Sequence, residues 1–455
     1  MDETRKLATF CAGFKFEDLP DDVIHKTKLC LLDYVANVYG SLALDAVSSV
    51  ASTIRSMGEI QNVTAVGCGF KTSIHLATYL NGITAEAIEA QDGLRFGGNH
   101  ACSAVIPAAL AVGESRGLGG KEIIAAIVAG YETANRISAS VHPWHTLSGF
   151  MPTGTCGTFG AAAAAGRLMG FNAKKMLHAL GNAGYVAPLS MAEQLMVGST
   201  IKIVQGGQAA SSGIMAALLS GAGITGDEHV LEGSDLKGGF TQITSRGEPK
   251  PELITDGLGE HFTMLDVYFK PYTACRHTHG AAQAVIHLIR EKIMPVDSIA
   301  AVDVYTYNMA VVAVGKGRTS GDSFVTAQFS IPHVVAVCLM DHEMGPAQLT
   351  EKRIADPALI ELSQKVTVKP DEKLNAAYPD KTSSRVEITL KNGEKRICQV
   401  DIPKGDPRDP MNMDDIHRKV GRFAGTRDAK QIDGLREIIQ DLDRMKDIRQ
   451  FIEAI

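Results

Sequence analysis

The chain has 455 residues, of which 45% are hydrophobic and 21% are charged, as is typical of a globular protein with two or three domains. Its formal net charge of −6, with no Lys/Arg-rich block, argues against nucleic-acid binding. Charged residues near the N-terminus argue against a signal peptide. The sequence contains no run of about 18 apolar residues, so no membrane span is predicted. We therefore expect a cytoplasmic protein.

The eight cysteines are scattered and include no CxxC pair. This spacing argues against zinc fingers and against a disulfide framework. Scattered cysteines without a secretion signal are usually small buried side chains in a reducing compartment. The sequence also contains no GxGxxG after a strand, no Walker loop, no GxSxG elbow and no HExxH. These absences remove most of the support for nucleotide and zinc chemistry.

The first 265 residues are predicted to be helical. A helix start is indicated at Leu19-Pro20-Asp21-Asp22, where a proline and two acids precede apolar residues at helical spacing. Two later segments are dense in glycine and alanine, which predicts closely packed helices. Further helices are expected at 73–91, 103–116, 120–142, 153–170, 172–184 and 205–221.

The pattern changes near residue 266. Ile299–Tyr307 alternates like a strand, and residues 385–400 form two alternating runs joined through Asn-Gly, which predicts a β-hairpin. We predict a mainly α fold with a large all-helical domain and a smaller α+β domain that contains an antiparallel sheet. The helical domain is expected to span 1–265, completed by C-terminal helices at 403–455, and the α+β domain to span 266–402.

A charged, glycine-broken loop at 89–107 lies between two of the apolar helices. Loops held by a rigid scaffold often carry catalytic or binding groups. His100 could act as a general acid or base because the pKa of a free imidazole is near neutrality. Asp92 could orient a cation or act as a base, and Arg95 could bind a carboxylate through its planar guanidinium. The alternative is a solvated loop whose acids cap the following helix.

Two later segments could contribute to the same site. Residues 141–157 contain His142, His145 and the only tryptophan ahead of a helix start, whose free N–H groups could bind an anion. A structural turn is the alternative there. Lys202 precedes a close-packed helix and could be semi-buried, which would let it pair with a carboxylate or lose proton affinity. An ordinary solvated lysine is the alternative.

The segment 269–279 carries Lys270, Arg276, His277 and His279 at the boundary between the two predicted domains. Domain interfaces favour ligand pockets. Arg276 and His279 would share one helical face if a helix has begun there. A solvated basic loop is the alternative, and metal binding is not favoured because CRHTH has no standard ligand spacing.

Taken together, four cations with several imidazoles and few acids favour a substrate that carries two or three carboxylates. The cations are Arg95, Lys202, Lys270 and Arg276. The same set suits removal of a proton from a carbon next to a carboxylate, because the developing negative charge needs positive neighbours.

Six segments together resemble a known family: His100–Glu114, Gly130–Glu132, Gly154–Leu168, Leu180–Gly181, Gly221–Gly226 and Lys270–Arg276. That family is MmgE/PrpD, which includes 2-methylcitrate dehydratase, cis-aconitate decarboxylase and iminodisuccinate epimerase. The resemblance covers nearly the whole chain. It implies a helical domain with a smaller α+β lid, a homodimer, and activity without metal or organic cofactor. It also implies that His100 matches the family's loop histidine, and that Lys202 and Lys270 match its two pocket lysines.

Two positions depart from the family pattern. The acidic motif of the family commonly reads Asp-Asp-Thr, whereas this chain has Gln91-Asp92-Gly93, so Asp92 matches only loosely. Dehydratases and decarboxylases of the family carry a histidine after Gly-Phe, where this chain has Met151. A thioether cannot transfer protons, so His145, or Asp92 with Arg95, would have to supply that group.

The sequence favours a lyase similar to 2-methylcitrate dehydratase, in which His100 or Lys202 removes an α-proton from a small di- or tricarboxylate. An epimerase or isomerase of a dicarboxylate is the main alternative, favoured by Met151. A cis-aconitate-type decarboxylase is the second alternative, and a carboxylate-sensing binding protein is the non-enzymatic one. The catalytic candidates are His100, Lys202, Asp92 and His145, and the substrate-binding candidates are Arg95, Lys270, Arg276 and His279.

Overall fold

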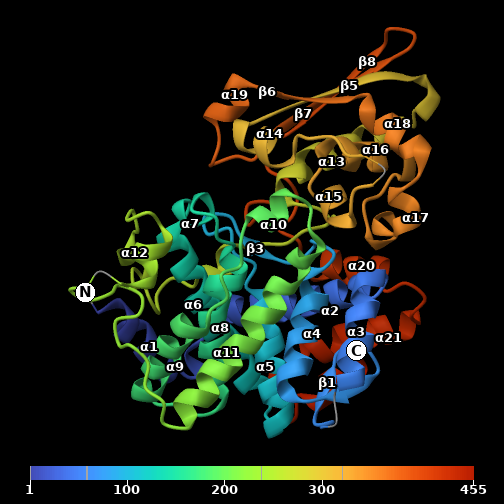
Figure 1. Ribbon diagram of the computed structural model, residues 1–455. Helices are drawn as coiled ribbons and strands as arrows, with labels where there is room; N and C mark the ends of the chain where they lie inside the picture. The colour runs from blue at the N-terminus through green and yellow to red at the C-terminus, as the bar shows by residue number, and fades with distance from the viewer. Residues whose placement is uncertain (1, 58–59, 237, 320) are drawn as a thin grey trace.

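The structure is a computed structural model that describes residues 2–57, 60–236, 238–319 and 321–455. Helices dominate the described chain and strands form a small part of it, so the predicted mainly α fold with a small α+β part is confirmed. In Figure 1 the helices of the first half and of the C-terminus form the lower part of the molecule, and the sheet with its own helices forms the upper part. Among the described residues, no helix is long and apolar enough to cross a membrane.

Seven helices account for most of the lower part. They are α2 Asp21–Ser41, α4 Ile74–Glu86, α5 Cys102–Arg116, α6 Gly120–Val141, α8 Pro152–Leu168, α9 Ala173–Val186 and α11 Gln205–Gly221. The most extensive packing joins α8 to α11 and to α6. Small residues explain the close approach, because a Cβ added at Gly82 of α4 would lie 2.5 Å from the Cα atom of Gly207 in α11.

Shorter helices surround this core. They are α1 Glu3–Gly13, α3 Asp45–Met57, α7 Trp144–Leu147, α10 Glu193–Met196 and α12 Phe240–Thr244. The chain returns to the lower part at its C-terminus, where α20 Met413–Phe423 packs on α2 and is followed by α21 Ala429–Gln440 and α22 Arg449–Ala454. Helix α20 starts with a capping box, in which the Asn412 side chain accepts from the Asp415 N–H and the Asp415 carboxylate accepts from the Asn412 N–H.

A four-stranded sheet with the order β6-β5-β7-β8 crosses the upper part. Its strands are β5 Ile299–Thr306, β6 Val366–Pro370, β7 Ser384–Leu390 and β8 Lys395–Val400. The hairpin β7–β8 and the pairing of β5 with β7 are antiparallel, as predicted. Strand β6 was not predicted, and it pairs with β5 in parallel, with Val302 opposite Val366.

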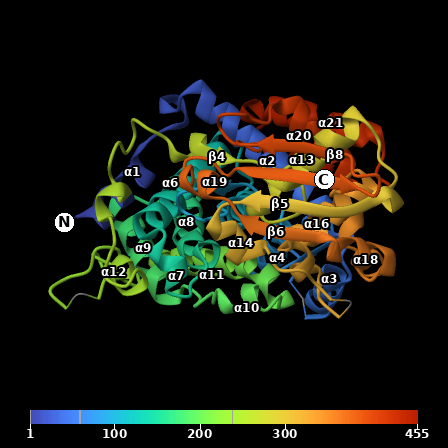
Figure 2. The same ribbon diagram turned by 90° about the horizontal axis from the view of Figure 1, so that it is seen from above.

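Helices cover one face of this sheet. The burial of β7 alternates strictly along the strand, as expected for a strand with one face on a core. Figure 2 shows the strands lying across the top of the molecule, with α13 and α16 beneath them. The helices of this part are α13 His279–Glu291, α14 Asn308–Val314, α15 Phe324–Gln328, α16 Ile331–Asp341, α17 Glu351–Ile354, α18 Pro357–Gln364 and α19 Glu372–Ala376.

A small strand pair joins the two parts of the molecule. Strand β3 Gly93–Leu94 pairs antiparallel with β4 Val267–Tyr268, so the loop after α4 lies against the segment that enters the upper part. A second small pair, β1 Val63–Ala65 with β2 Phe70–Thr72, precedes α4. The predicted domain boundaries stay a prediction.

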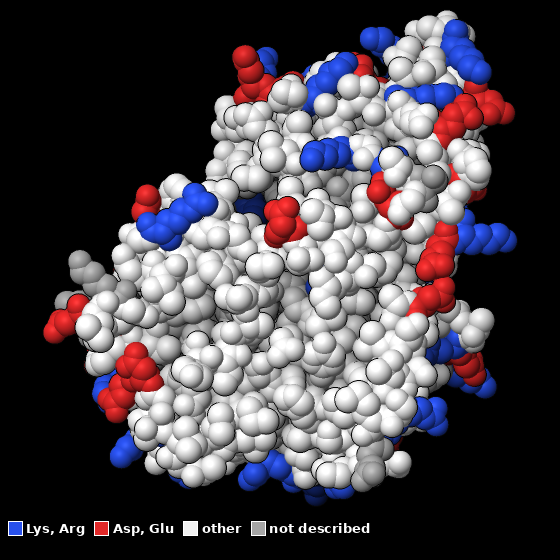
Figure 3. Space-filling view, in the orientation of Figure 1, with Lys and Arg blue, Asp and Glu red and all other residues white. Residues whose placement is uncertain are grey.

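Charged side chains lie mainly around the edge of the face shown in Figure 3, and the centre of that face carries few.

Candidate active site

The loop after α4 has an unusual backbone at its first acidic residue. Helix α4 ends at Glu86, and Glu89 takes a left-handed conformation with φ 55°. For a residue other than glycine this conformation costs about 1–3 kcal/mol and persists only where the surroundings hold it. The Glu89 carboxylate binds two lysines, one through each oxygen, and these contacts hold the loop.

Four buried side chains form the centre of the site, and we call Glu86, Glu89, Lys202 and Lys270 the pocket cluster. The Lys202 ammonium lies 2.9 Å from Glu86 Oε1 and also contacts Glu89 Oε2. The Lys270 ammonium lies 2.6 Å from Glu89 Oε1 and donates to the Glu89 carbonyl. Each of the four residues is at most 6% exposed. Contrary to the sequence-based expectation of few acids, two carboxylates therefore balance the two lysines.

The charges of the pocket cluster stabilise one another. Burial alone would raise the pKa of Glu89, but the Lys202 and Lys270 ammonium groups outweigh it and hold that pKa well below the usual range. Burial likewise opposes the charge of Lys202, yet Glu86 and Glu89 raise its pKa above the ordinary lysine value. Lys202 therefore stays protonated, and it can donate a hydrogen bond but cannot act as a base near neutral pH.

The sequence did not single out Glu86, although a signal was present. Glu86 and Glu89 are three residues apart at the end of a predicted helix, a spacing that brings two side chains to one face. Gln205, the first residue of α11, also donates to Glu86 Oε1, over 2.7 Å. Glu86 Oε2 is buried and has no hydrogen-bond partner among the described residues.

His100 lies where the loop meets the start of α8. Its backbone N–H donates to the Thr153 hydroxyl, and its ring Nδ1 lies 2.5 Å from the Asp92 carbonyl oxygen. A carbonyl can only accept, so Nδ1 carries the proton and Nε2 is the basic nitrogen. Burial and the nearby Lys270 charge lower the pKa of His100 to about 4. The imidazole is consequently neutral at pH 7.

The Asp92 carboxyl group turns away from His100 into the core. It accepts from the Tyr131 hydroxyl at 2.6 Å and from the Cys102 N–H at 3.4 Å. Burial raises its pKa to about 6. Asp92 therefore contacts His100 through its backbone carbonyl. Tyr131 lies in a segment that carries the family resemblance, but nothing in its local sequence indicated this contact.

A second buried ion pair supports the loop from below. Lys419 of α20 lies 2.6 Å from the Asp33 carboxylate of α2, and its ammonium also donates to the Ala90 carbonyl at 2.7 Å. Both side chains are at most 1% exposed. We call Asp33 and Lys419 the support pair. Its partners are 386 residues apart, so no local sequence pattern indicated it.

Arg95 bridges from the loop to the upper part of the molecule. Its guanidinium donates to the Pro379 carbonyl at 3.0 Å and to the Asp380 carbonyl. It also lies over the Phe96 ring, 4.3 Å from the ring centre. The side chain is half-buried, and burial lowers its pKa below the usual arginine value.

Arg276 and His279, two substrate-binding candidates from the upper part of the molecule, are also held by backbone carbonyls. Arg276 donates to the Pro403 carbonyl at 2.7 Å and to the Lys404 carbonyl at 2.8 Å. The His279 Nε2 lies 3.0 Å from the Ala274 carbonyl oxygen. Burial and the Arg276 charge keep the pKa of His279 well below its usual value, so this imidazole is neutral.

His145 lies behind the segment that carries Met151. Its ring stacks on Phe150 and packs against Phe240, and its Nε2 is 2.7 Å from the Thr155 hydroxyl. Burial lowers its pKa to about 4. The structure thus brings His100 close enough to Lys270 and Lys202 for their charges to act on it, whereas His145 packs between Phe150 and Phe240.

A pocket of about 150 Å³ opens beside Lys202. Met151, the N-cap residue of α8, lines this pocket. Met151 is two residues before Thr153, whose hydroxyl accepts from the His100 backbone N–H. The remaining lining residues are Pro188, Ser190, Met191, Gln194, Leu195, Ile201, Val204, Gln205 and Gln208.

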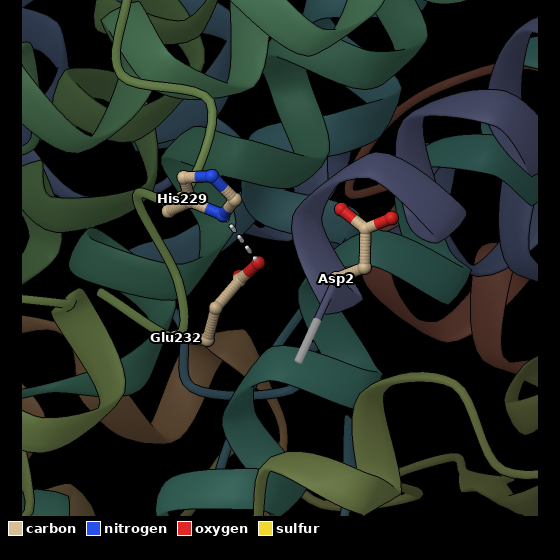
Figure 4. A group of neighbouring side chains, drawn as sticks. All are labelled: Asp2, His229 and Glu232. Carbon is tan, nitrogen blue, oxygen red and sulfur yellow. Dashed lines mark hydrogen bonds and ion pairs between the residues drawn. The ribbon is translucent and has the colours of Figure 1, made fainter. Parts of the chain in front are cut away.

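One group of potential metal ligands lies far from this site, near the N-terminus. Asp2, His229 and Glu232 bring three possible ligand atoms together (Figure 4). Glu232 already accepts from Thr4 through one oxygen and lies 3.2 Å from His229 through the other. The Arg5 guanidinium, 3.3 Å from Asp2, further disfavours a cation there.

Comparison with known proteins identifies the family to which the sequence belongs. The MmgE/PrpD N-terminal domain matches residues 5–252, and the MmgE/PrpD C-terminal domain matches residues 272–444. The chain is 26% identical to cis-aconitate decarboxylase of Aspergillus terreus, over 99% of this chain and 95% of that protein. It is also 26% identical to cis-aconitate decarboxylase of Homo sapiens, over 98% of this chain and 92% of that protein. The two domain matches together span most of the sequence, and the chain therefore belongs to the MmgE/PrpD family.

Proposed function

We propose that the protein is a cofactor-independent enzyme that removes a proton α to a carboxylate of a small di- or tricarboxylate. His100 is the base in this proposal. The contact between its Nδ1 and the Asp92 carbonyl is the observation that carries the assignment, because it leaves Nε2 unprotonated and fixes the ring. Lys202, whose pKa is raised by Glu86 and Glu89, is the charged donor rather than the base.

The lysines of the pocket cluster can still contact a substrate. An ammonium group has three N–H donors. Lys202 directs two of them to Glu86 and Glu89, and Lys270 directs two to the side chain and carbonyl of Glu89. Lys202 lines the pocket, so its third donor could bind a carboxylate and stabilise the negative charge that develops when the α-proton leaves. Lys270 is fully buried and would reach a substrate only after a movement of the loop that carries Glu89.

Among reaction types, a lyase that eliminates water remains our first choice. The base would take the α-proton, the electrons of the C–H bond would form the C=C bond, and the hydroxyl group would leave with a proton from an acid such as Lys202. Arg95 and Arg276 remain proposed carboxylate contacts. To reach a substrate, their guanidinium groups would have to leave the backbone carbonyls that now hold them.

An epimerase or isomerase is the second candidate, and Met151 favours it. This side chain lines the pocket where a proton-transferring histidine would serve a leaving hydroxyl, and a thioether cannot serve it. A decarboxylase is the third candidate, supported by the names of the relatives. A carboxylate-sensing protein without turnover is the non-enzymatic alternative.

One experiment separates these candidates. The protein is incubated in D₂O with 2-methylcitrate, cis-aconitate and methylsuccinate, and the products are followed by NMR. An unsaturated product formed from 2-methylcitrate without release of CO₂ supports the lyase, and deuterium at the α-carbon of saturated material with inverted configuration and no unsaturated product supports the epimerase. Release of CO₂ supports the decarboxylase. Thermal stabilisation by a probe without any exchange or product would contradict an enzymatic function.

We also propose that two copies of the chain form a homodimer. Large apolar side chains are exposed on the segments around α10 and α11, among them Tyr185 (93% exposed), Leu189 (70%) and Val197 (64%). Figure 3 shows few charged residues at the centre of the face to which α11 belongs. Exposed apolar patches of this kind mark interaction sites. Sedimentation equilibrium of the protein and of Val197→Asp tests this proposal, and a monomeric parent protein would contradict it.

A further inference from the structure

The pocket beside Lys202 differs chemically from the pocket cluster that it adjoins. Among the described residues that line it, Lys202 is the only charged one, and the polar ones are a serine and three glutamines. The apolar side chains come from the start of α8, from the 188–195 segment and from the 3-10 turn that carries Lys202. They are Met151, Pro188, Met191, Leu195, Ile201 and Val204.

A second carboxylate has no suitable partner in this pocket. Among the described residues Lys202 is the single cation at its wall, and its one remaining donor serves the reacting carboxylate of the proposed substrate. A carboxylate buried against apolar side chains without a paired cation loses its hydration with no compensation. An alkyl group placed there gains from burial. The chemistry of the lining therefore selects an apolar substituent.

The size of the pocket sets the size of that substituent. An apolar cavity of about 150 Å³ is known to hold benzene, a group of six carbons. The pocket volume of about 150 Å³ therefore suits an alkyl chain of roughly four to six carbons rather than a single methyl group.

Met151 is held at the wall by its backbone. Its N–H donates to the Ser190 carbonyl at 2.7 Å, and the preceding residue, Phe150, forms a β-bridge with Met191. Met151 and Met191 therefore come from two segments that are paired across the pocket wall. An unbranched thioether packs well against alkyl groups of variable shape.

We propose that this pocket binds an alkyl substituent of the carboxylate substrate and that Met151 determines the preference for it. The inference rests on the proposed function, because it places the reacting carboxylate at Lys202 with the substituent pointing past Met151. It defines the substrate class as a small alkyl-substituted dicarboxylate. The alkyl group enters the pocket, and the polar end stays at the pocket cluster.

Isothermal titration with succinate and its 2-methyl, 2-propyl, 2-butyl and 2-hexyl derivatives tests the proposal. We expect Kd to fall by about fourfold per added methylene until the pocket is full. In Met151→Gln, which keeps the length of the side chain, the fall should shrink to less than twofold per methylene. Met57→Gln, at an exposed methionine outside the pocket, should bind the series like the unchanged protein.

Kd values that do not fall with chain length in the unchanged protein, or no binding of any member, would overturn the proposal. The Kd series of the unchanged protein tests the proposal even if Met151→Gln does not fold. Deuterium exchange at the α-carbon, measured on the same compounds, keeps the two ideas separate. Binding that improves with chain length but without exchange leaves the alkyl pocket standing and contradicts the proton abstraction. Exchange at a rate independent of chain length, with constant Kd, leaves the proton abstraction standing and contradicts the alkyl pocket.

Discussion

Two buried lysine–carboxylate groups contact the same loop, one at Glu89 and one at the Ala90 carbonyl, and their electrostatics differ. In the support pair, burial raises the pKa of Asp33 and lowers the pKa of Lys419, so each charge is disfavoured despite its partner. In the pocket cluster, the pKa of Glu89 is lowered and that of Lys202 is raised, because each has two partners of opposite charge. A second partner of opposite charge offsets the desolvation cost of burying a charged group, whereas a single partner does not offset it fully.

The comparison separates a reactive group from a supporting one. Lys202 of the pocket cluster lines an open pocket, whereas the ammonium of Lys419 is directed to the Asp33 carboxylate and to a backbone carbonyl. Burial of a lysine therefore does not by itself indicate function. We expect loss of the His100 imidazole to reduce activity with little loss of stability, and loss of one partner of the support pair to do the opposite.

The largest effect is expected for His100→Asn. Loss of a general base lowers a rate by about 10²- to 10⁴-fold, and the asparagine amide can still donate to the Asp92 carbonyl. We therefore expect α-deuterium exchange to fall by that factor, while the free energy of unfolding in urea changes by less than about 1 kcal/mol. His178→Asn is the matched control, because His178 also directs Nδ1 at a backbone carbonyl, that of Gly226. Equal loss of exchange in both variants would contradict the assignment.

Next in size is the loss of stability expected for Lys419→Met. Removal of one partner from a buried pair leaves the other charge unpaired and costs about 3–5 kcal/mol. Urea unfolding at unchanged m-value measures it. The double variant Asp33→Leu/Lys419→Met should recover most of the loss, since apolar replacement of a buried pair is often neutral. Lys121→Met, which breaks an exposed pair with Glu17, should leave the urea midpoint nearly unchanged. A cost for Lys419→Met as small as that of Lys121→Met would remove the contrast between the two groups.

The pH dependence of stability gives a smaller effect. The pKa values of His100, His145 and His277 are lowered from 6.5 to about 4, so between these limits the unfolded chain binds more protons than the folded one. Acidification from pH 6.5 towards 4 should therefore destabilise the protein, by about 1 kcal/mol per histidine and pH unit. Asp92 opposes this trend below pH 6, because its pKa is raised and the folded state holds its proton. Urea midpoints at pH 7 and 5 measure the balance, and a higher midpoint at pH 5 would show that the carboxyl groups dominate.

The smallest effect is expected for Arg95→Gln. Its bonds to two backbone carbonyls are half-exposed, so their loss should cost about 1 kcal/mol or less. We expect KM for an exchanging substrate to rise by less than about threefold, because a guanidinium that must first leave two backbone carbonyls contributes little net binding to a substrate carboxylate. Arg396→Gln, which also loses a guanidinium bond to a distant carbonyl, that of Lys292, is the control. A tenfold rise in KM confined to the Arg95 variant would establish Arg95 as a substrate contact.

Much of the fold could be predicted because its signals are local. The β7–β8 hairpin follows from alternating residues on both sides of Asn392-Gly393, and the buried helices follow from apolar periodicity. Strand β6 was missed because Val366–Pro370 is too short to show a pattern. Its parallel pairing with β5 also joins segments more than 60 residues apart.

The candidate site was only partly predictable, because some of its contacts join residues that are distant in the sequence. His100, Lys202 and Lys270 stood out as isolated polar residues near apolar or glycine-rich segments, and the structure brings them together. The acids that balance the lysines were not foreseen, although Glu86 lies three residues before Glu89. The support pair depends on tertiary contact between α2 and α20, which no window of sequence contains.

The bond from Lys419 to the Ala90 carbonyl has a consequence for the order of synthesis. The two residues are separated by 329 positions in the chain. At a translation rate of about 5–20 residues per second, the lysine follows the loop by roughly 15–65 s. During that interval a nascent chain holds the loop without its support from α20. The geometry around His100 is therefore complete only after the ribosome has released the segment that contains Lys419.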